Sequence, residues 1–224
     1  VVQFASAEII EVYRWEPHPG RSADMLATMQ EAAQIHTALG ANIQINALDI
    51  GSTQNIDYVM RYDDMSDWGA SRDRNAASEE WTAFFARYSS DPAGKLVASI
   101  QGVNTDPSAM ADDFSEHPVF NVNIWEPAVG RGGDLAQGLA AAKAIHEELG
   151  ARVEVYNEGF GGTNTQHYVM FFDSWTHMAE VTEAMSTSES WQAFMAATAA
   201  ASASAGGPAA ALVERFAGRV VANF

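Results

Sequence analysis

The 224-residue chain contains no cysteine, and this absence removes three kinds of chemistry. It excludes a disulfide framework, a thiol nucleophile and a metal site with cysteine ligands. It does not decide between a reducing and an oxidising compartment, because proteins without cysteine occur in both. Long apolar runs are also missing. No stretch approaches the roughly 18 residues of a membrane-spanning helix, so we expect no membrane insertion.

Basic residues are scarce, with 12 Lys and Arg against 29 Asp and Glu, which gives a formal net charge of −17. Lys95 and Lys143 are the only lysines. A field of this sign repels nucleic acid and anionic membrane surfaces, because their recognition depends on neutralising phosphate groups. We therefore expect neither as a partner. A cytoplasmic location is expected, and the small-residue pattern Ala5-x-Ala7 leaves a processed leader, and so a periplasmic or exported protein, as an alternative.

What the chain does contain is an internal duplication. Trp15-Glu16-Pro17 returns as Trp125-Glu126-Pro127, an offset of 125 − 15 = 110 residues. The same offset relates three further blocks to their copies: Ile35-His36 to Ile145-His146, Tyr58-Val59-Met60 to Tyr168-Val169-Met170, and Glu79-x-Trp81 to Glu189-x-Trp191. A period near 100 is too long for a solenoid repeat. We interpret the chain as one domain that has been duplicated.

Hydrophobic spacing and turn residues predict the order strand, helix, strand, strand, helix, strand in each half. The predicted strands are 8–15, 42–48, 56–62 and 96–101, and then 119–125, 152–158, 166–172 and 212–221. The predicted helices are 23–39 and 63 to about 88, and then 134–149 and 173 to about 199. Gly40 and Gly150 stand where each first helix should end. Residues 1–107 and 118–224 form the two repeats, 108–117 an acidic linker, and 196–207 a loose loop.

The βαββαβ order is that of the ferredoxin-like unit. Such a unit carries helices on one face of its sheet, so the other face must find a cover. Two units in one chain supply that cover when their sheets face each other and their helices lie outside. We therefore predict an α+β fold in which two tandem ferredoxin-like repeats form a pseudo-two-fold barrel. This barrel needs no second chain, and further homo-oligomerisation is left open.

Several segments resemble a known group of proteins. The stretch Glu11 to Gly20, EVYRWEPHPG, is similar to the opening of NIPSNAP proteins, a Glu-x-Arg-x-Tyr strand running into Pro-Gly, although Tyr13 and Trp15 replace its Arg and Tyr. The Tyr62-Asp63 step and the segments SEEWTAF (78–84) and SESWQAF (188–194) resemble the dimeric α/β-barrel superfamily. That group includes NIPSNAP, stress-responsive barrel proteins and cofactor-independent antibiotic-biosynthesis monooxygenases. Its members also include isomerases, cyclases and haem proteins, so the resemblance implies a fold and no single reaction. The catalytic residues remain unknown.

Strand residues of such a barrel alternate between the helices and the lumen. We assign the apolar residues of the two first strands to the helix side: Ile10, Val12, Phe120, Val122 and Ile124. The lumen then receives eight candidate ligand-binding residues: Glu11, Tyr13, Trp15, Arg61, Asn121, Asn123, Trp125 and His167. From the second strands it receives Gln44, Asn46, Glu154 and Tyr156. Aromatic walls with a few polar groups are typical of a small-molecule site.

We therefore expect the barrel lumen to bind a small organic molecule. If the protein is an enzyme, the resemblance implies a cofactor-independent oxygenase or isomerase. The alternative is a non-catalytic structural or stress-related protein whose barrel is filled by side chains. A lumen on the order of several hundred Å³ would favour the first reading. Because the halves differ at Tyr13/Asn123, we expect one ligand per chain, off the pseudo-axis and near these residues and Arg61.

His36 and His146 recur in both halves near the end of the first helix, which favours a structural role at the helix–sheet seam. The spacing of the histidines and carboxylates matches no metal motif, so we expect no metal. A haem would need an axial ligand facing a cavity, and His167 is the one inward-facing candidate. We expect no cofactor. The glycine-rich segment 159–162 joins two predicted strands, which favours a hairpin turn over a phosphate-binding loop.

Overall fold

The computed structural model of the protein describes residues 7–52, 54–111 and 117–224. The first repeat comprises β1 (Ile9–Pro17), α1 (Ser22–Ala38), β2 (Asn42–Ile50), β3 (Ile56–Tyr62), α2 (Met65–Ala77), α3 (Glu79–Ser90) and β4 (Gly94–Asn104). The second comprises β5 (Val119–Pro127), α4 (Gly132–Glu148), β6 (Arg152–Glu158), β7 (Gln166–Phe172), α5 (Trp175–Thr187), α6 (Glu189–Ser204) and β8 (Ala210–Asn223). Residues 1–6, which include Ala5 of the proposed leader pattern, and residues 112–116 of the proposed linker lie outside the described residues.

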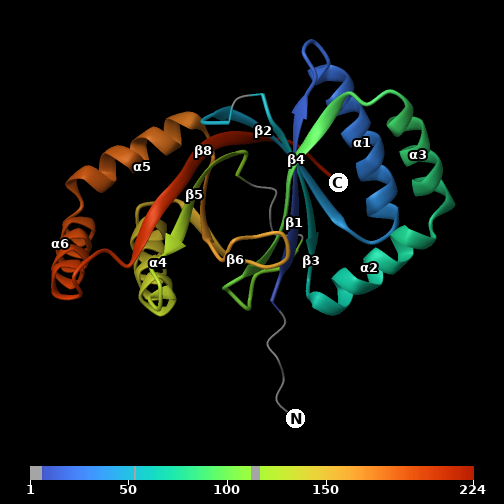
Figure 1. Ribbon diagram of the computed structural model, residues 1–224. Coiled ribbons are helices and arrows are strands. Elements are labelled where there is room, and N and C mark those ends of the chain that lie inside the picture. Colours follow the sequence, from blue (N-terminus) through green and yellow to red (C-terminus); the bar gives the residue numbers. More distant parts are fainter. Residues whose placement is uncertain (1–6, 53, 112–116) are drawn as a thin grey trace.

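The strands form one closed barrel in the order β1-β3-β2-β8-β5-β7-β6-β4. Each repeat contributes the four-strand order of a ferredoxin-like unit, β4-β1-β3-β2 and β8-β5-β7-β6. Two antiparallel seams join the repeats, β2 with β8 and β4 with β6. The helices lie outside the sheet (Figure 1). A single chain thus closes the α+β barrel, as the duplication predicts.

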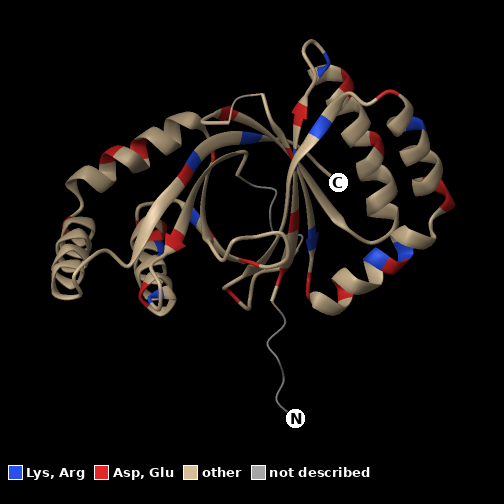
Figure 2. Cartoon of the chain, in the orientation of Figure 1, with Lys and Arg blue, Asp and Glu red and all other residues tan. Residues whose placement is uncertain are grey.

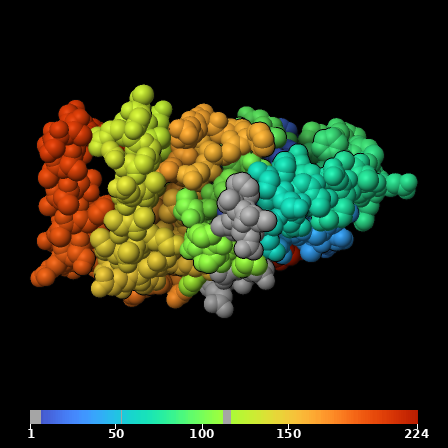
Figure 3. Space-filling model, turned by 90° about the horizontal axis from the view of Figure 1, so that it is seen from below, coloured from blue at the N-terminus to red at the C-terminus, as the bar shows by residue number. Residues whose placement is uncertain are grey.

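The two repeats lie side by side, with the first blue to green and the second yellow to red (Figure 3). Their first helices end as expected, because Gly40 and Gly150 adopt positive φ values of 89° and 104°. Such a conformation is easy for glycine and strained for residues with a Cβ atom. None of the helices in the described ranges has both the length and the apolar run that a bilayer crossing requires.

The predicted second helix of each repeat is in fact two helices. Ser78 and Ser188 interrupt them with extended backbone, at φ −78° and ψ 118°, and φ −69° and ψ 121°. Their hydroxyl oxygens accept hydrogen bonds from the backbone N–H groups of Trp81 and Trp191, both at 3.1 Å. Serine at such a position satisfies a free N–H of the new helix. The hydrophobic periodicity runs across this break, which is why it suggested one helix.

The prediction of a loose loop at residues 196–207 was also wrong, since α6 continues to Ser204. Alanine has the highest helix propensity, and it dominates this segment. Helix α6 carries a single charged residue, Glu189, and is almost uniformly tan in Figure 2. Helix α6 has 16 residues and its equivalent α3 has 12, so the second repeat has a longer helix at this position.

Candidate functional site

The lumen of the barrel encloses a cavity of about 160 Å³. Arg61 and His167 line it, as predicted, together with Gln44, Asn46, Glu154 and Tyr156 of the second strands. The prediction was wrong for the first strands. Their apolar residues line the lumen instead of facing the helices: Ile10, Val12, Phe120, Val122 and Ile124.

Six of the eight candidate residues therefore lie outside the lumen, on the helix side of the sheet: Glu11, Tyr13, Trp15, Asn121, Asn123 and Trp125. Tyr13 and Trp15 pack against the buried cluster beneath α1, and Trp125 packs against the equivalent cluster beneath α4. Asn123 lies on the same side, where it accepts from Arg215 Nε at 2.6 Å and donates to Asn121 at 3.1 Å. The expected lumen site near Tyr13 and Asn123 does not exist.

The pairing of strands explains this inversion. Val12 is the partner of Val59, and Tyr13 is the partner of Tyr58. Residues directly opposite each other on neighbouring strands face the same side. Since Tyr58 belongs to the core beneath the helices, Tyr13 must face the helices as well. Polarity alone suggested the opposite, because the first strand places polar residues under the helices and apolar residues in the lumen.

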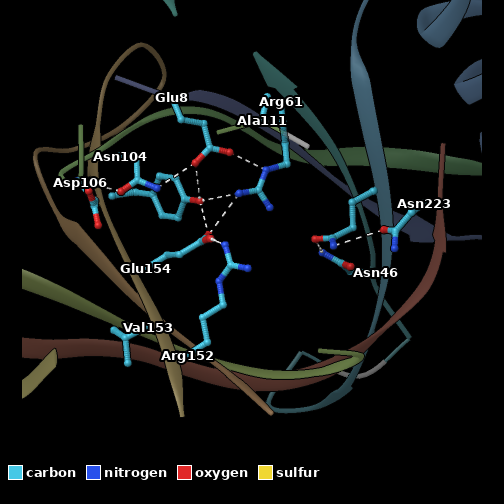
Figure 4. Close-up of polar contacts among 12 residues, drawn as sticks. Glu8, Asn46, Arg61, Asn104, Asp106, Ala111, Arg152, Val153, Glu154 and Asn223 are labelled. Atoms are coloured by element: carbon cyan, nitrogen blue, oxygen red, sulfur yellow. Dashed lines mark hydrogen bonds and ion pairs between the residues drawn. The ribbon is translucent and has the colours of Figure 1, made fainter. Parts of the chain in front are cut away.

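The charged groups of the lumen are paired with one another. Arg61 donates to Glu8 Oε1 at 2.5 Å and to Glu154 Oε2 at 3.2 Å. The Tyr156 hydroxyl donates to Glu154, and Asn104 Nδ2 donates to Glu8 at 2.8 Å. Burial raises the pKa of Tyr156 well above 10, so its hydroxyl stays protonated. Figure 4 shows this cluster on one side of the lumen.

A second pair lies at the other end of β1. Arg14 donates two hydrogen bonds to Asp57, both at 2.8 Å, and a third to Glu214 at 3.2 Å. The Arg14 guanidinium also lies over the Phe216 ring, 4.3 Å from its centroid. Bidentate pairs of this kind fix both side chains. The lumen therefore offers few charged groups that are free to bind a ligand.

A second cavity, of about 150 Å³, lies between the sheet and the helices of the first repeat. We name it the helix–sheet cavity. Aromatic and methionine side chains form most of its wall: Trp15, Trp81, Phe84, Tyr88, Met25 and Met29. Polar groups from β1, α1 and α2 converge on it: Tyr13, His36, Arg72 and Asn75. This combination of an apolar wall and a few polar groups is that of a ligand site.

Tyr13 belongs to a polar network at this wall. Its hydroxyl donates to Glu11 at 2.9 Å and accepts from Arg72 at 3.0 Å. Trp68 Nε1 donates to the other Glu11 oxygen at 2.7 Å. Burial, and then the adjacent Glu11 carboxylate, raise the pKa of Tyr13 to about 12. The Tyr13 hydroxyl is therefore neutral at neutral pH, and the Glu11 carboxylate and the Arg72 guanidinium hold it in one orientation.

His36 and Asn75, which line this cavity, each have a buried polar atom without a partner among the described residues. The His36 ring is buried against Trp81, with 4.3 Å between the ring centroids, and its Nδ1 lies 2.7 Å from the Tyr58 hydroxyl. His36 Nε2 and Asn75 Oδ1 are buried without a hydrogen-bond partner among the described residues. Buried polar atoms are normally paired with protein or water. Burial lowers the pKa of His36 to about 4, so the ring is neutral at neutral pH.

The equivalent positions of the second repeat lack this polar wall. His146 keeps the same bond to a tyrosine, at 2.7 Å from the Tyr168 hydroxyl. At the offset of 110, however, the other polar residues are replaced: Glu11 by Asn121, Tyr13 by Asn123, Trp68 by Met178, Arg72 by Thr182 and Asn75 by Met185. The predicted seam position of both histidines is confirmed, although each bonds a tyrosine. Comparing the repeats beyond the strands would have singled out Arg72 and Asn75, which the sequence analysis missed.

The described residues do not fit a metal or a haem. No group of three or more His, Asp and Glu in these ranges could hold a metal ion. Both cavities are smaller than the roughly 300 Å³ at which ligand sites begin, and a porphyrin would not fit in either. His167 lines the lumen as expected, but its Nε2 lies 2.9 Å from Glu158.

The fold matches solved structures over nearly the whole chain. A candidate monooxygenase from Fusobacterium nucleatum has a TM-score of 0.65 at 10% identity, and the match covers 97% of this chain and 94% of that one. An anthrone oxidase-like protein has a TM-score of 0.64 at 10% identity, with 98% and 93% covered. A haem-binding protein from Thermus thermophilus has a TM-score of 0.51 at 9% identity, with 97% and 92% covered. At these identities the likeness establishes the fold alone.

Sequence comparison points to one family. The family model described as NIPSNAP matches residues 10–98, which lie within the first repeat. No curated protein sequence matches the chain. The resemblance expected from the EVYRWEPHPG segment is thereby confirmed. The first repeat is thus similar to NIPSNAP, and the whole chain has the ferredoxin-like fold, built as a tandem pair of repeats.

Proposed function

We propose that the protein binds a small organic molecule, and that its main site is the helix–sheet cavity of the first repeat. The observation that carries this proposal is the pair of buried, unpartnered atoms, His36 Nε2 and Asn75 Oδ1, on two residues that line the cavity. A ligand with a ring-sized apolar body and a polar edge would pack against Trp81 and satisfy both atoms. The two repeats differ at this wall, so one ligand per chain is expected.

We also propose the lumen, where the sequence predicted the ligand, as a second binding site. Its cavity of about 160 Å³ argues against a barrel completely filled by side chains. It is smaller than typical ligand sites, whose volumes are on the order of 300–1,000 Å³. Its charged groups are already paired, which makes it a poorer place for a polar substrate than the helix–sheet cavity. A cytoplasmic location likewise remains a proposal.

We further propose that the protein converts this ligand chemically. A cofactor-independent isomerase must take a proton from one atom of its substrate and return it to another. In the tautomer whose Nδ1–H donates to Tyr58, the His36 Nε2 lone pair is free to accept such a proton. Tyr13 and Arg72 then orient the substrate through neutral and cationic donors. A cofactor-independent oxygenase would need the same proton acceptor together with dioxygen as the oxidant.

Benzamide is a suitable probe, because it combines one ring with two N–H donors and one acceptor. Its binding is measured by NMR of the methionine methyl groups, since Met25 and Met29 line this cavity. We expect these methyl signals to shift. His36→Gln and Asn75→Met should weaken binding about fivefold each, the worth of one hydrogen bond. The methionine of the second variant is the residue at the equivalent position of the second repeat.

The matched control is His146→Gln, which removes the same ring from the same kind of tyrosine pair in the second repeat. It should leave benzamide affinity within about twofold of the unchanged protein, less than one hydrogen bond is worth. Equal losses in the His36 and His146 variants would show a general effect on stability and refute the proposed site. Methyl signals that do not shift would refute it too. Native mass spectrometry of freshly purified protein tests for a co-purified ligand.

A further inference from the structure

The lumen differs chemically from the helix–sheet cavity. Aliphatic and aromatic side chains line most of it, among them Ile10, Val12, Val59, Val122, Ile124 and Phe171. Arg61 is engaged by Glu8 and Glu154, and Arg14 by Asp57. A water molecule inside a protein needs two to four polar partners. The apolar part of the lumen does not provide them, so the cavity is suited to an apolar guest.

One polar atom of the lumen is left without a partner. Asn46 is buried, its Nδ2 donates to Gln44 Oε1 at 3.3 Å, and its Oδ1 has no hydrogen-bond partner among the described residues. Asn46 lies on β2 at the seam with β8, where the pairing shifts register between Ile45 and Asn46. Bulges of this kind often redirect a side chain. Figure 4 shows Asn46 across the lumen from the cluster around Arg61.

The pseudo-symmetry of the barrel shows that the side chain at Asn46 is smaller than the one at the equivalent position. Its equivalent in the second repeat, at 46 + 110 = 156, is Tyr156. Tyr156 projects into the lumen and joins the cluster of Glu154 and Arg61. The much smaller asparagine cannot fill the corresponding volume on its own side. Where the second repeat has a tyrosine, the first repeat thus has a smaller side chain with one unpaired acceptor.

We propose that the lumen binds a compact, mostly apolar molecule, about one aromatic ring in size, that donates a single hydrogen bond to Asn46 Oδ1. The volume is sufficient, because an apolar protein cavity of about 150 Å³ accommodates benzene. The recognised class is therefore a small aromatic with one O–H or N–H group. The inference concerns the lumen as a separate site, and it holds whether or not the helix–sheet cavity binds a ligand.

Three probes of nearly equal shape test the proposal. Phenol can donate to Asn46, benzene has no polar group, and anisole can only accept. Binding is followed by NMR of isoleucine and valine methyl groups, because Ile10 and Val122 line the lumen, whereas methionine methyls report on the helix–sheet cavity. We expect phenol to shift the lumen methyls and to bind about fivefold more tightly than benzene or anisole.

Asn46→Leu is the specific variant, since leucine is similar in size and cannot accept a hydrogen bond. It should abolish the preference for phenol while benzene still binds. Val122→Phe should block all three probes by filling the lumen. Val169→Phe serves the same purpose if the first variant fails to fold, because Val169 also lines the cavity.

Each other outcome overturns the proposal. Lumen methyls that no probe shifts would show that the lumen is closed to guests. Anisole binding as well as phenol, or a preference for phenol that survives in Asn46→Leu, would exclude Asn46 as the acceptor. Shifts confined to methionine methyls would assign the probes to the helix–sheet cavity, which refutes the lumen site without affecting the function proposed for that cavity.

Discussion

Acidification should destabilise the protein between pH 6.5 and pH 4 through two buried histidines. His36 and His146 lie under the helices, each with Nδ1 at 2.7 Å from a tyrosine hydroxyl. Each is only 5% exposed. Burial lowers the pKa of both rings from 6.5 to about 4. The folded protein therefore keeps them neutral at pH values where the unfolded chain binds protons.

The magnitude follows from this difference in pKa. A lowering from 6.5 to about 4 is about 2.5 units, and each unit corresponds to roughly 1.4 kcal/mol. Each histidine thus makes the free energy of unfolding about 3 kcal/mol lower in acid than at neutral pH. In the window between the two values the unfolded state holds more protons, so the free energy of unfolding rises with pH. This stability is fully present above pH 6.5 and is lost as the pH falls to about 4.

Urea unfolding at half-unit steps from pH 7.5 to pH 4 measures this dependence. His36→Gln and His146→Gln remove one titrating group each and retain a polar side chain. Each variant should be less stable at pH 7 and should show a flatter pH dependence, and the double variant should be flattest. Glu158 does not interfere with this measurement. Its hydrogen bonds lower its pKa from 4.5 to about 2, so it titrates below this pH window. A double variant with the slope of the unchanged protein would refute the reasoning, as would an NMR pKa near 6.5 for either ring.

Three further predictions concern the fold. Arg61→Met should reduce the free energy of unfolding by about 3–5 kcal/mol, because it leaves the buried Glu8 without its cation and Glu154 with Arg152 alone. A loss below about 1 kcal/mol in urea unfolding would contradict this account. Ser78→Ala and Ser188→Ala should each cost about 1 kcal/mol in thermal unfolding, and no loss would argue against their role as helix caps. Gly218→Ala should lower the melting temperature, because a Cβ atom would lie 2.2 Å from a backbone oxygen of β2, whereas Gly138→Ala, with open space around it, should raise the melting temperature.

Much of the architecture follows from the sequence because it depends on local periodicity and on the duplication. The offset between Trp15 and Trp125 defines two equivalent units, and a ferredoxin-like unit with one bare sheet face requires a cover. Residues of the second and third strands were also placed correctly, since Gln44, Asn46 and Arg61 line the lumen as expected. The break at Ser78 was missed, because serine caps a helix only where the chain also leaves helical geometry.

The location of the site was not predictable from one strand at a time. Alternation divides the residues of β1 into two sets, but it does not state which set faces inward. That choice depends on the partner strand: Tyr13 faces the helices because it pairs with Tyr58. The helix–sheet cavity further requires that α1 and α2 bring His36 and Asn75 to one wall, although they are 39 residues apart (75 − 36).

The sequence by itself determined the repeats, their order of elements and the closure of a barrel by one chain, because hydrophobic periodicity and a 110-residue offset are properties of the chain alone. Only the tertiary structure decided which residues enclose space. Cavities arise where packed side chains fail to fill a volume, as in the lumen that Asn46 and its pseudo-symmetric equivalent Tyr156 both line. That outcome depends on the sizes and orientations of side chains from several strands at once, which no single stretch of sequence contains.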